Sequence, residues 1–169
     1  MEAIEMLKTR RSCRSFKKEQ LKEENLQEIL DCGLNAPSGM NRQDTRIVVL
    51  QDPELIQVFS RLNGLIWGRD SDPFYGAPTV ALVLATKENP NNVKDGSLVI
   101  GAMQNGAYAL GIGSCWINRC KEMLETQEGN SYLTKWGLED YVGVGCVSLG
   151  YPDQPDLPHK IKEGRIIRL

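Results

Sequence analysis

The chain has 169 residues, a hydrophobic fraction of 41% and a formal net charge of −2. This length suits one domain with a sizeable core, and the small negative charge argues against a nucleic-acid-binding protein, which would carry a broad basic face. The N-terminus lacks the basic and apolar runs of a signal peptide, and no apolar stretch is long enough to span a bilayer. We therefore expect a cytoplasmic protein with no membrane attachment.

Apolar residues at helical spacing alternate with compact β-branched runs along the chain. Asp52, Pro53 and Glu54 are typical of a helix start, with Asp as the N-cap. The segment 63–77, rich in Gly, Asp and aromatic residues, is expected to be irregular. Helices are predicted at 2–9, 22–34, from 52 onward, at 97–110 and within 122–136. Strands are predicted at 45–51, 79–85, 111–117 and 141–149.

These elements indicate one domain of mixed helices and strands over residues 1–169. The helix at 97–110 is apolar nearly all round, which is typical of a helix buried on most sides, here by a sheet with a second subunit as a further candidate cover. The segment 150–169 is rich in proline and basic residues and cannot form a core of its own. It is predicted to be a C-terminal arm that docks on something or stays mobile.

The five cysteines and the single histidine are poorly spaced for a metal site or a disulfide framework. None of the cysteines forms a C-x-x-C pair, and His159 lies in the proline-rich tail. This spacing gives little support to zinc binding. We predict no metal and reduced thiols.

The densest basic cluster comprises Arg10, Arg11 and Arg14, with Ser12 and Ser15 among them. Guanidinium forks and hydroxyl groups suit a phosphate, which accepts several charge-assisted hydrogen bonds at once. The alternative is a solvated basic helix end, where cations complement the negative pole of the helix dipole. The cluster alone leaves both interpretations open.

A second notable segment is the loop 36–43, with the sequence APSGMNRQ. Ser38 and Gly39 form a small-residue corner that admits a ligand near the backbone, and the amides of Asn41 and Gln43 suit a heteroaromatic edge. The alternative is a helix C-cap followed by a turn. The chain has no G-x-S-x-G, Walker-A or G-x-G-x-x-G pattern, which favours a cofactor that carries the reaction itself.

Five segments together resemble the nitroreductase family of FMN-dependent oxidoreductases. In order and spacing they are RRSCRSF at 10–16, APSGMNRQ at 36–43, GAP at 76–78, ALGIGSCWI at 109–117 and GYP at 150–152. The resemblance covers nearly the whole chain and is to the compact branch of the family. It implies an α+β fold with three α-β-α layers, a central mixed or antiparallel sheet and an extended C-terminal arm.

The resemblance also implies a homodimer with FMN at the subunit interface. The arginine cluster would hold the phosphate, the ribityl chain and the pyrimidine edge, and the 36–43 loop would come from the other subunit. The 116–118 segment would pass the isoalloxazine near N5, and the arm would return basic residues to the phosphate. The implied cofactor-binding residues are Arg10, Arg11, Ser12, Arg14, Pro37, Ser38, Gly39, Asn41, Gln43, Trp116, Ile117, Asn118, Lys160, Lys162 and Arg165.

Two segments depart from the family pattern. Asp44 follows Gln43 where the family often has proline, so a negative charge is expected near the pocket mouth. The segment 63–75 has no clear family counterpart. Its aromatic residues either roof the flavin and select the substrate or pack in an interface; they are Trp67, Phe74 and Tyr75.

The activity that the resemblance implies is a ping-pong hydride transfer from NADH or NADPH, through flavin N5, to a nitroaromatic, a quinone or a similar electron-poor small molecule. No side chain is expected to act as a catalytic acid or base, because the flavin carries the chemistry. One alternative is a flavin-binding carrier or sensor without NAD(P)H turnover. Another is an enzyme of the same fold that acts on one specific substrate.

Overall fold

Four strands form one antiparallel sheet in a computed structural model that describes residues 2–155 and 159–169. The order across the sheet is β1-β2-β4-β3, and every neighbouring pair is antiparallel. The strands are β1 (Thr45–Leu50), β2 (Thr79–Thr86), β3 (Gly113–Ile117) and β4 (Tyr141–Gly150). The sheet is therefore of the antiparallel kind, one of the two arrangements expected.

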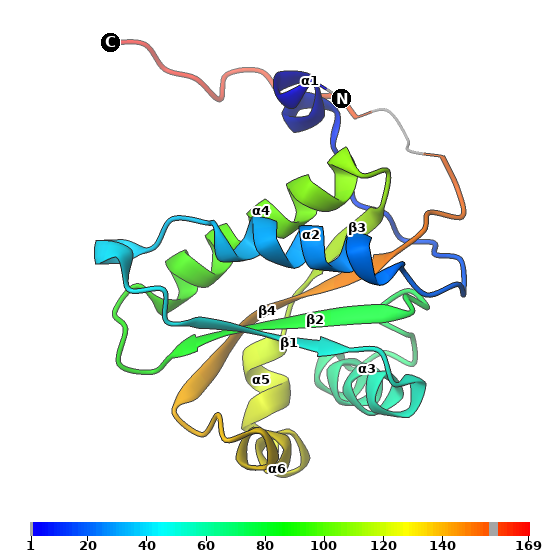
Figure 1. Ribbon diagram of the computed structural model, residues 1–169, viewed down its shortest axis with the longest axis vertical. Helices are drawn as coiled ribbons and strands as arrows, with labels where there is room; N and C mark the ends of the chain where they lie inside the picture. The colour runs from blue at the N-terminus through cyan, green and yellow to red at the C-terminus, as the bar shows by residue number, and fades with distance from the viewer. Residues whose placement is uncertain (1, 156–158) are drawn as a thin grey trace.

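Helices cover both faces of this sheet, which gives the predicted α-β-α layers (Figure 1). One layer holds α2 (Glu23–Leu34) and α4 (Asn92–Ala109). The other holds α3 (Pro53–Trp67), α5 (Cys120–Glu125) and α6 (Gln127–Trp136). The short α1 (Ala3–Thr9) lies against one end of α4, and the 3-10 turn η1 (Gly39–Asn41) lies near its other end.

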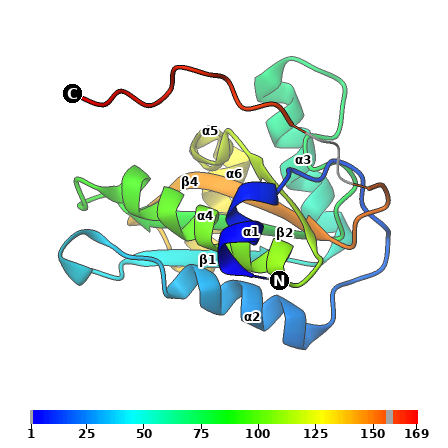
Figure 2. The ribbon, with the colours of Figure 1, turned by 90° about the horizontal axis from the view of Figure 1, so that it is seen from above.

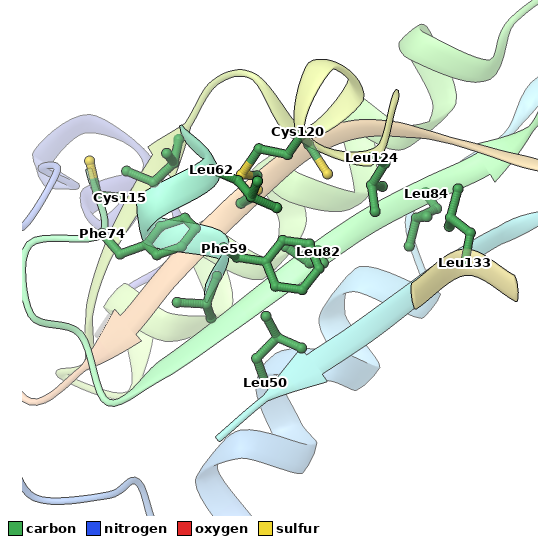
Figure 3. Packing of buried hydrophobic residues seen from close by; sticks show 14 residues of the cluster. Leu50, Phe59, Leu62, Phe74, Leu82, Leu84, Cys115, Cys120, Leu124 and Leu133 are labelled. Atoms are coloured by element: carbon green, nitrogen blue, oxygen red, sulfur yellow. The ribbon is translucent and has the colours of Figure 1, made fainter. Parts of the chain in front are cut away.

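The strand β2 is buried on both faces, and its side chains divide between two cores. Leu82 and Leu84 point toward α3, α5 and α6, whereas Val83 points toward α2 and α4, as the two-residue period of a strand requires. Figure 3 shows Leu82 and Leu84 packed with Phe59 of α3 and Leu133 of α6. These apolar contacts stabilise the sheet between the helical layers.

The helix α3 begins as predicted and ends later than predicted. The Asp52 carboxylate accepts a hydrogen bond from Glu54 N at 3.0 Å, which confirms the N-cap. The prediction of an irregular segment from residue 63 is wrong for its first residues, because α3 continues through Trp67 and is capped by Gly68 at φ 70°. Gly64 lies inside the helix, where a Cβ would come within 3.2 Å of Arg69 O, so the glycine serves close packing rather than a turn.

The helix α4 also begins earlier than predicted, at Asn92 rather than residue 97. Its first turns carry polar residues that resemble a loop in the sequence. Gly96 is buried there, and a Cβ on it would lie 2.6 Å from Val144 of β4. The missing side chain thus lets the helix pack closely on the sheet.

The C-terminal arm is anchored at its start and exposed beyond. Lys17 N donates to Tyr151 O at 2.9 Å, and Asp153 N donates to Ser15 O at 3.0 Å. Residues 156–158 lie outside the described residues, and 159–169 are exposed throughout. Figure 1 shows this last segment leaving the body of the protein and passing α1. Within the described ranges, no helix combines the length and the apolar character needed to cross a membrane.

Candidate functional site

The arginine cluster lies beside the edge strand β3. Cys13 N donates to Ser114 O at 2.8 Å, so the backbone after Arg11 runs along this strand. A Cβ on Gly113 would lie 2.8 Å from Cys13 Sγ, and only a residue without a side chain permits this approach. The glycines of the 109–117 segment therefore include one that positions the arginine cluster.

Two guanidinium atoms of the cluster are buried without an acceptor. Arg10 Nη1 and Arg11 Nε have no hydrogen-bond partner among the described residues, although Arg11 Nη1 donates to Arg10 O at 2.8 Å. Burying charged donors without acceptors is costly, and phosphate oxygens are the acceptors that guanidinium groups bind best. The alternative of a solvated basic helix end does not account for this burial.

The remaining motif residues surround the Cys115 thiol of β3. Burial raises the pKa of Cys115, while the nearby Arg14 guanidinium and a hydrogen bond with Ser12 act in the opposite direction. Arg10 also lies close enough to act on this thiol. The structure thus brings Arg10, Ser12 and Arg14 to the same strand, and Cys115 is a neutral thiol of the core beneath them.

The 36–43 loop presents strained backbone at the surface. Met40, Asn41 and Gln43 have φ angles of 55°, 55° and 52°, in the left-handed region that non-glycine residues rarely adopt. Gln43 N donates to Ser38 Oγ at 3.1 Å, and Gln43 Nε2 donates to Asn41 Oδ1 at 2.9 Å. The two amides predicted to meet a heteroaromatic edge are exposed and bonded to each other. Pro37 and Met40 are also exposed.

A buried polar network holds this loop to α4. The Asp95 carboxylate, 4% exposed, accepts from Gly39 N at 3.1 Å and from Asn89 Nδ2 at 2.9 Å. Asn89 Nδ2 also donates to Asp44 Oδ1 at 3.1 Å, and Thr86 Oγ1 donates to Asp44 Oδ2 at 2.9 Å. Both Asp44 oxygens are thus bound at the base of the loop, and the negative charge expected at the pocket mouth stays a prediction.

The end of β3 exposes Trp116 and buries Ile117, and Asn118, which follows the strand, is exposed. The Ile117 side chain belongs to the core, so this residue can meet a ligand only through its backbone. The Trp116 side chain, 50% exposed, packs over Gly145 of β4, where a Cβ would collide with its indole nitrogen. A small residue on the neighbouring strand thus makes room for the ring.

Asn63 of α3 fixes the turn that follows β3. The sequence pattern placed this residue in an irregular segment. Its side chain is fully buried, donates to Asn118 O at 2.8 Å and accepts from Arg119 Nε at 2.9 Å. Arg119 itself has a left-handed φ of 73°. No sequence pattern reveals this contact, because α3 and the turn lie far apart along the chain.

The aromatic residues of 63–75 take different environments. Phe74 is fully buried in the core with Phe59, as Figure 3 shows, so neither role proposed for it is correct. Trp67 and Tyr75 are 37% and 36% exposed. Only these two remain available to a ligand.

The four predicted parts of the site do not all meet within one chain. The arginine cluster and the 116–118 segment adjoin through β3, whereas the 36–43 loop lies at the opposite end of α4 from α1 (Figures 1 and 2). The basic residues of the arm form no hydrogen bond or ion pair within the described part of the chain. These are Lys160, Lys162 and Arg165, all exposed.

A family model of the nitroreductase family matches residues 7–151. The chain belongs to this family. The match spans all the segments that carried the resemblance up to Tyr151, from the arginine cluster to the end of β4, and leaves out the exposed residues 159–169. Family membership makes the protein an oxidoreductase.

Curated relatives and solved structures agree with this nitroreductase assignment. A protein of Archaeoglobus fulgidus, provisionally named NADH dehydrogenase/NAD(P)H nitroreductase, is 29% identical over 92% of this chain and 88% of its own length. The crystal structure of a nitroreductase with bound FMN from Bacteroides fragilis has a TM-score of 0.91 and 28% identity, covering 100% of this chain and 99% of that one. A nitroreductase with bound FMN from Desulfitobacterium hafniense has a TM-score of 0.88 and 25% identity, with the same coverage.

Proposed function

We propose that this nitroreductase-family protein binds FMN and transfers hydride, in a ping-pong cycle, from NADH or NADPH to a small electron-poor acceptor such as a nitroaromatic or a quinone. When bound, FMN supplies a centre at N5 that both accepts and donates hydride. The observation that carries the proposal is the pair of buried, unpartnered atoms Arg10 Nη1 and Arg11 Nε beside β3. The FMN held by two similar structures supports it.

The arginine cluster would neutralise the FMN phosphate, which carries about −1.5 to −2 charges near neutral pH. Arg10 Nη1 and Arg11 Nε are donors without an acceptor in the free chain, so phosphate oxygens would supply the acceptors that they lack. Ser12 would bind the ribityl chain. Arg14, which is exposed beside β3, would place a cation near the pyrimidine edge and stabilise negative charge there.

The 116–118 segment would line the flavin ring. Its turn is held by the fully buried Asn63, so its backbone is fixed before any ligand arrives. Trp116 and Asn118 are exposed, and Ile117 offers backbone groups alone. A backbone that is already fixed here would orient the flavin ring without the entropic cost of ordering this segment on binding.

A second copy of the chain would complete the site. The 36–43 loop, including Pro37, Ser38, Gly39, Asn41 and Gln43, lies at the far end of α4 from the arginine cluster, so the two parts would meet only between copies. Apolar side chains exposed on α1, α4 and the arm would be covered by the same contact. They include Ile4, Leu7, Val93, Leu98, Ile161, Ile166, Ile167 and Leu169.

Within that dimer the arm would bring Lys160, Lys162 or Arg165 to the phosphate. The whole chain, 1–169, would act as one domain with the arm as its extension. The spacing of the five cysteines does not suggest a disulfide framework, which favours a reducing compartment, and we place the reaction in the cytoplasm.

The test is anaerobic mixing of the purified protein with NADH and with NADPH. Release of FMN, identified by mass, and bleaching of the flavin absorption band are expected. A bound flavin that neither nicotinamide bleaches would instead identify a carrier or sensor. Product analysis with nitrobenzene and a benzoquinone then identifies the acceptor class, and an FMN-bound monomer in sedimentation would contradict the shared site.

A further inference from the structure

Two arginines stack on the ring of Trp67. The Arg69 guanidinium carbon lies 4.5 Å from the ring centre, and that of Arg119 lies 4.7 Å from it. Both distances are those of cation–π contacts. In the part of the chain that the structure describes, neither arginine forms an ion pair with a carboxylate. Two like charges held near one ring repel each other, and an anion that binds both would offset that cost.

Neither of the two aspartates that follow Arg69 closely in the chain, Asp70 and Asp72, forms an ion pair with it. The Asp72 carboxylate accepts hydrogen bonds from Ser60 Oγ and from the backbone of Phe74 and Gly76, at 2.6 to 2.9 Å. Asp70 follows Arg69 directly and lines the same cavity, but it lies beyond ion-pair distance of it. The two cations are thus left without a counter-ion from the surrounding elements.

The local backbone holds Arg69 and Arg119 in place at the Trp67 ring. Arg119 is held in left-handed backbone at φ 73°, and its Nε donates to the fully buried Asn63 at 2.9 Å. Gly68, at φ 70°, ends α3 and turns the chain so that Arg69 returns to the ring of Trp67. Two separate turns therefore hold the two guanidinium groups at one aromatic ring, and such preorganisation lowers the cost of binding an anion.

The position of the cluster indicates which anion it meets. Arg119 follows Asn118 directly, at the end of the segment that would line the flavin ring. Arg69 lines a cavity of about 1370 Å³ that extends along α3 to Ala77 and Pro78. A reductant whose nicotinamide lies on the flavin would direct the rest of the molecule away from that ring, and its phosphates are the charged part.

We infer that Arg69 and Arg119, stacked on Trp67, bind the pyrophosphate of the reducing nicotinamide dinucleotide. This inference rests on the proposed function and adds a binding site for its reductant. Planar guanidinium forks bind phosphate oxygens in pairs, and the aromatic ring keeps both forks in place. The cluster is a specificity device, since a reductant without phosphates gains nothing from it.

The test compares Arg69→Gln with the control Arg61→Gln in the FMN-loaded protein. Arg61 lines the same cavity but is already paired with Glu128 at 2.6 Å, so both variants remove one exposed positive charge from one cavity. Calorimetry with ADP-ribose, which has the pyrophosphate and no nicotinamide, measures binding apart from turnover. KM is measured for NADH and for the phosphate-free reductant 1-benzyl-1,4-dihydronicotinamide.

Arg69→Gln is expected to weaken ADP-ribose binding and to raise KM for NADH, each about tenfold, the loss of one charge-assisted contact. The benzyl reductant should be unaffected, and Arg61→Gln should leave all three values near wild type. The inference would be overturned if both variants had equal KM and Kd values, or if Arg69→Gln raised KM for the benzyl reductant as much as for NADH. Flavin bleaching would still support the proposed function in either case. A rise in KM for 4-nitrobenzoate alone, with NADH unchanged, would assign the anion to the acceptor and overturn it too. Failure of every nicotinamide to bleach the flavin would overturn both.

Discussion

The N-terminal arginine cluster and the C-terminal arm are both basic and both predicted to meet one phosphate, yet the structure treats them differently. Cys13 and Phe16 are buried beside Ala77, and backbone hydrogen bonds tie the cluster to β3 and to the start of the arm. Residues 159–169 have no such anchors and are exposed. Charge brings a segment toward an anion, but apolar burial and backbone pairing decide where it lies in the free chain.

The largest expected effect is the loss of FMN binding in Arg10→Ala. This variant removes the donor atom that is buried without an acceptor, and two charge-assisted hydrogen bonds to phosphate correspond to about 3 kcal/mol, or roughly 100-fold in Kd. Titration of the apoprotein by FMN fluorescence quenching measures it. The control Arg46→Ala, an exposed arginine of β1, should bind FMN normally. Equal affinities for the two variants would refute the phosphate role.

The anchor itself is tested by Gly113→Ala. The new Cβ would meet Cys13 Sγ at 2.8 Å and Gly150 O at 3.2 Å, so the cluster must move away from β3. Such overpacking costs about 1–3 kcal/mol in the free energy of unfolding, measured by urea denaturation, and FMN binding should weaken with it.

The double variant Gly113→Ala with Cys13→Gly serves as the control, because it removes both Cys13 atoms that the new methyl group meets, Sγ at 2.8 Å and Cβ at 2.9 Å. It should regain part of the lost stability, as expected for residues in contact. If it loses as much as the sum of the single variants, the contact does not position the cluster.

A smaller effect is expected from the arm. Replacing Lys160 and Lys162 together by alanine should raise the Kd for FMN about fivefold, since exposed ionic contacts contribute roughly 0.2–1 kcal/mol each. The unfolding free energy of the chain should not change, because these side chains pack on nothing in the free structure. Added salt should weaken FMN binding less in this variant than in the wild type. A rise in the Kd for FMN as large as that of Arg10→Ala would contradict the proposed difference between the arginine cluster and the arm.

The smallest effect concerns the thiol beneath the cluster. Burial raises the pKa of Cys115 above its ordinary value of 9.0, so the folded protein keeps a proton that the unfolded chain loses first. Stability is therefore complete below about pH 9 and falls as pH rises further. In Cys115→Ala the unfolding free energy, measured from pH 8 to 10, should fall less steeply than in wild type. An unchanged slope would show that this thiol does not contribute.

Local sequence patterns predicted most helices and strands and the arginine cluster. They did not predict contacts between segments that lie far apart in the sequence. β-branched runs marked β1 and β2 because a buried strand needs little else. Asn63 and Gly64 resembled a turn, yet both are buried within α3, where tertiary contacts override their weak helix propensity. The hydrogen bond between Asn89 and Asp95 joins the residues before α4 to its first turn, and no sequence pattern predicted it.

In the candidate site, too, the residues that are close in sequence could be predicted and the contacts between distant segments could not. Arg10, Ser12 and Arg14 are close in sequence, so their convergence could be predicted, and the resemblance assigned them and the 116–118 segment to one flavin. Arg69 and Arg119 meet only because α3 and the β3–α5 turn pack together. Single-sequence patterns carry no signal for such a pairing.

The helix α4 has 18 residues, which corresponds to a length of about 27 Å. The Asp95 network holds the 36–43 loop at its first turns, and α1 lies against its other end. In the proposed dimer this helix would therefore set the spacing between two cofactor pockets. Inserting one residue in its middle would shift one end by about 1.5 Å and rotate it by about 100°. In that dimer, a change in the length of α4 would therefore misalign the 36–43 loop of one copy with the arginine cluster of the other.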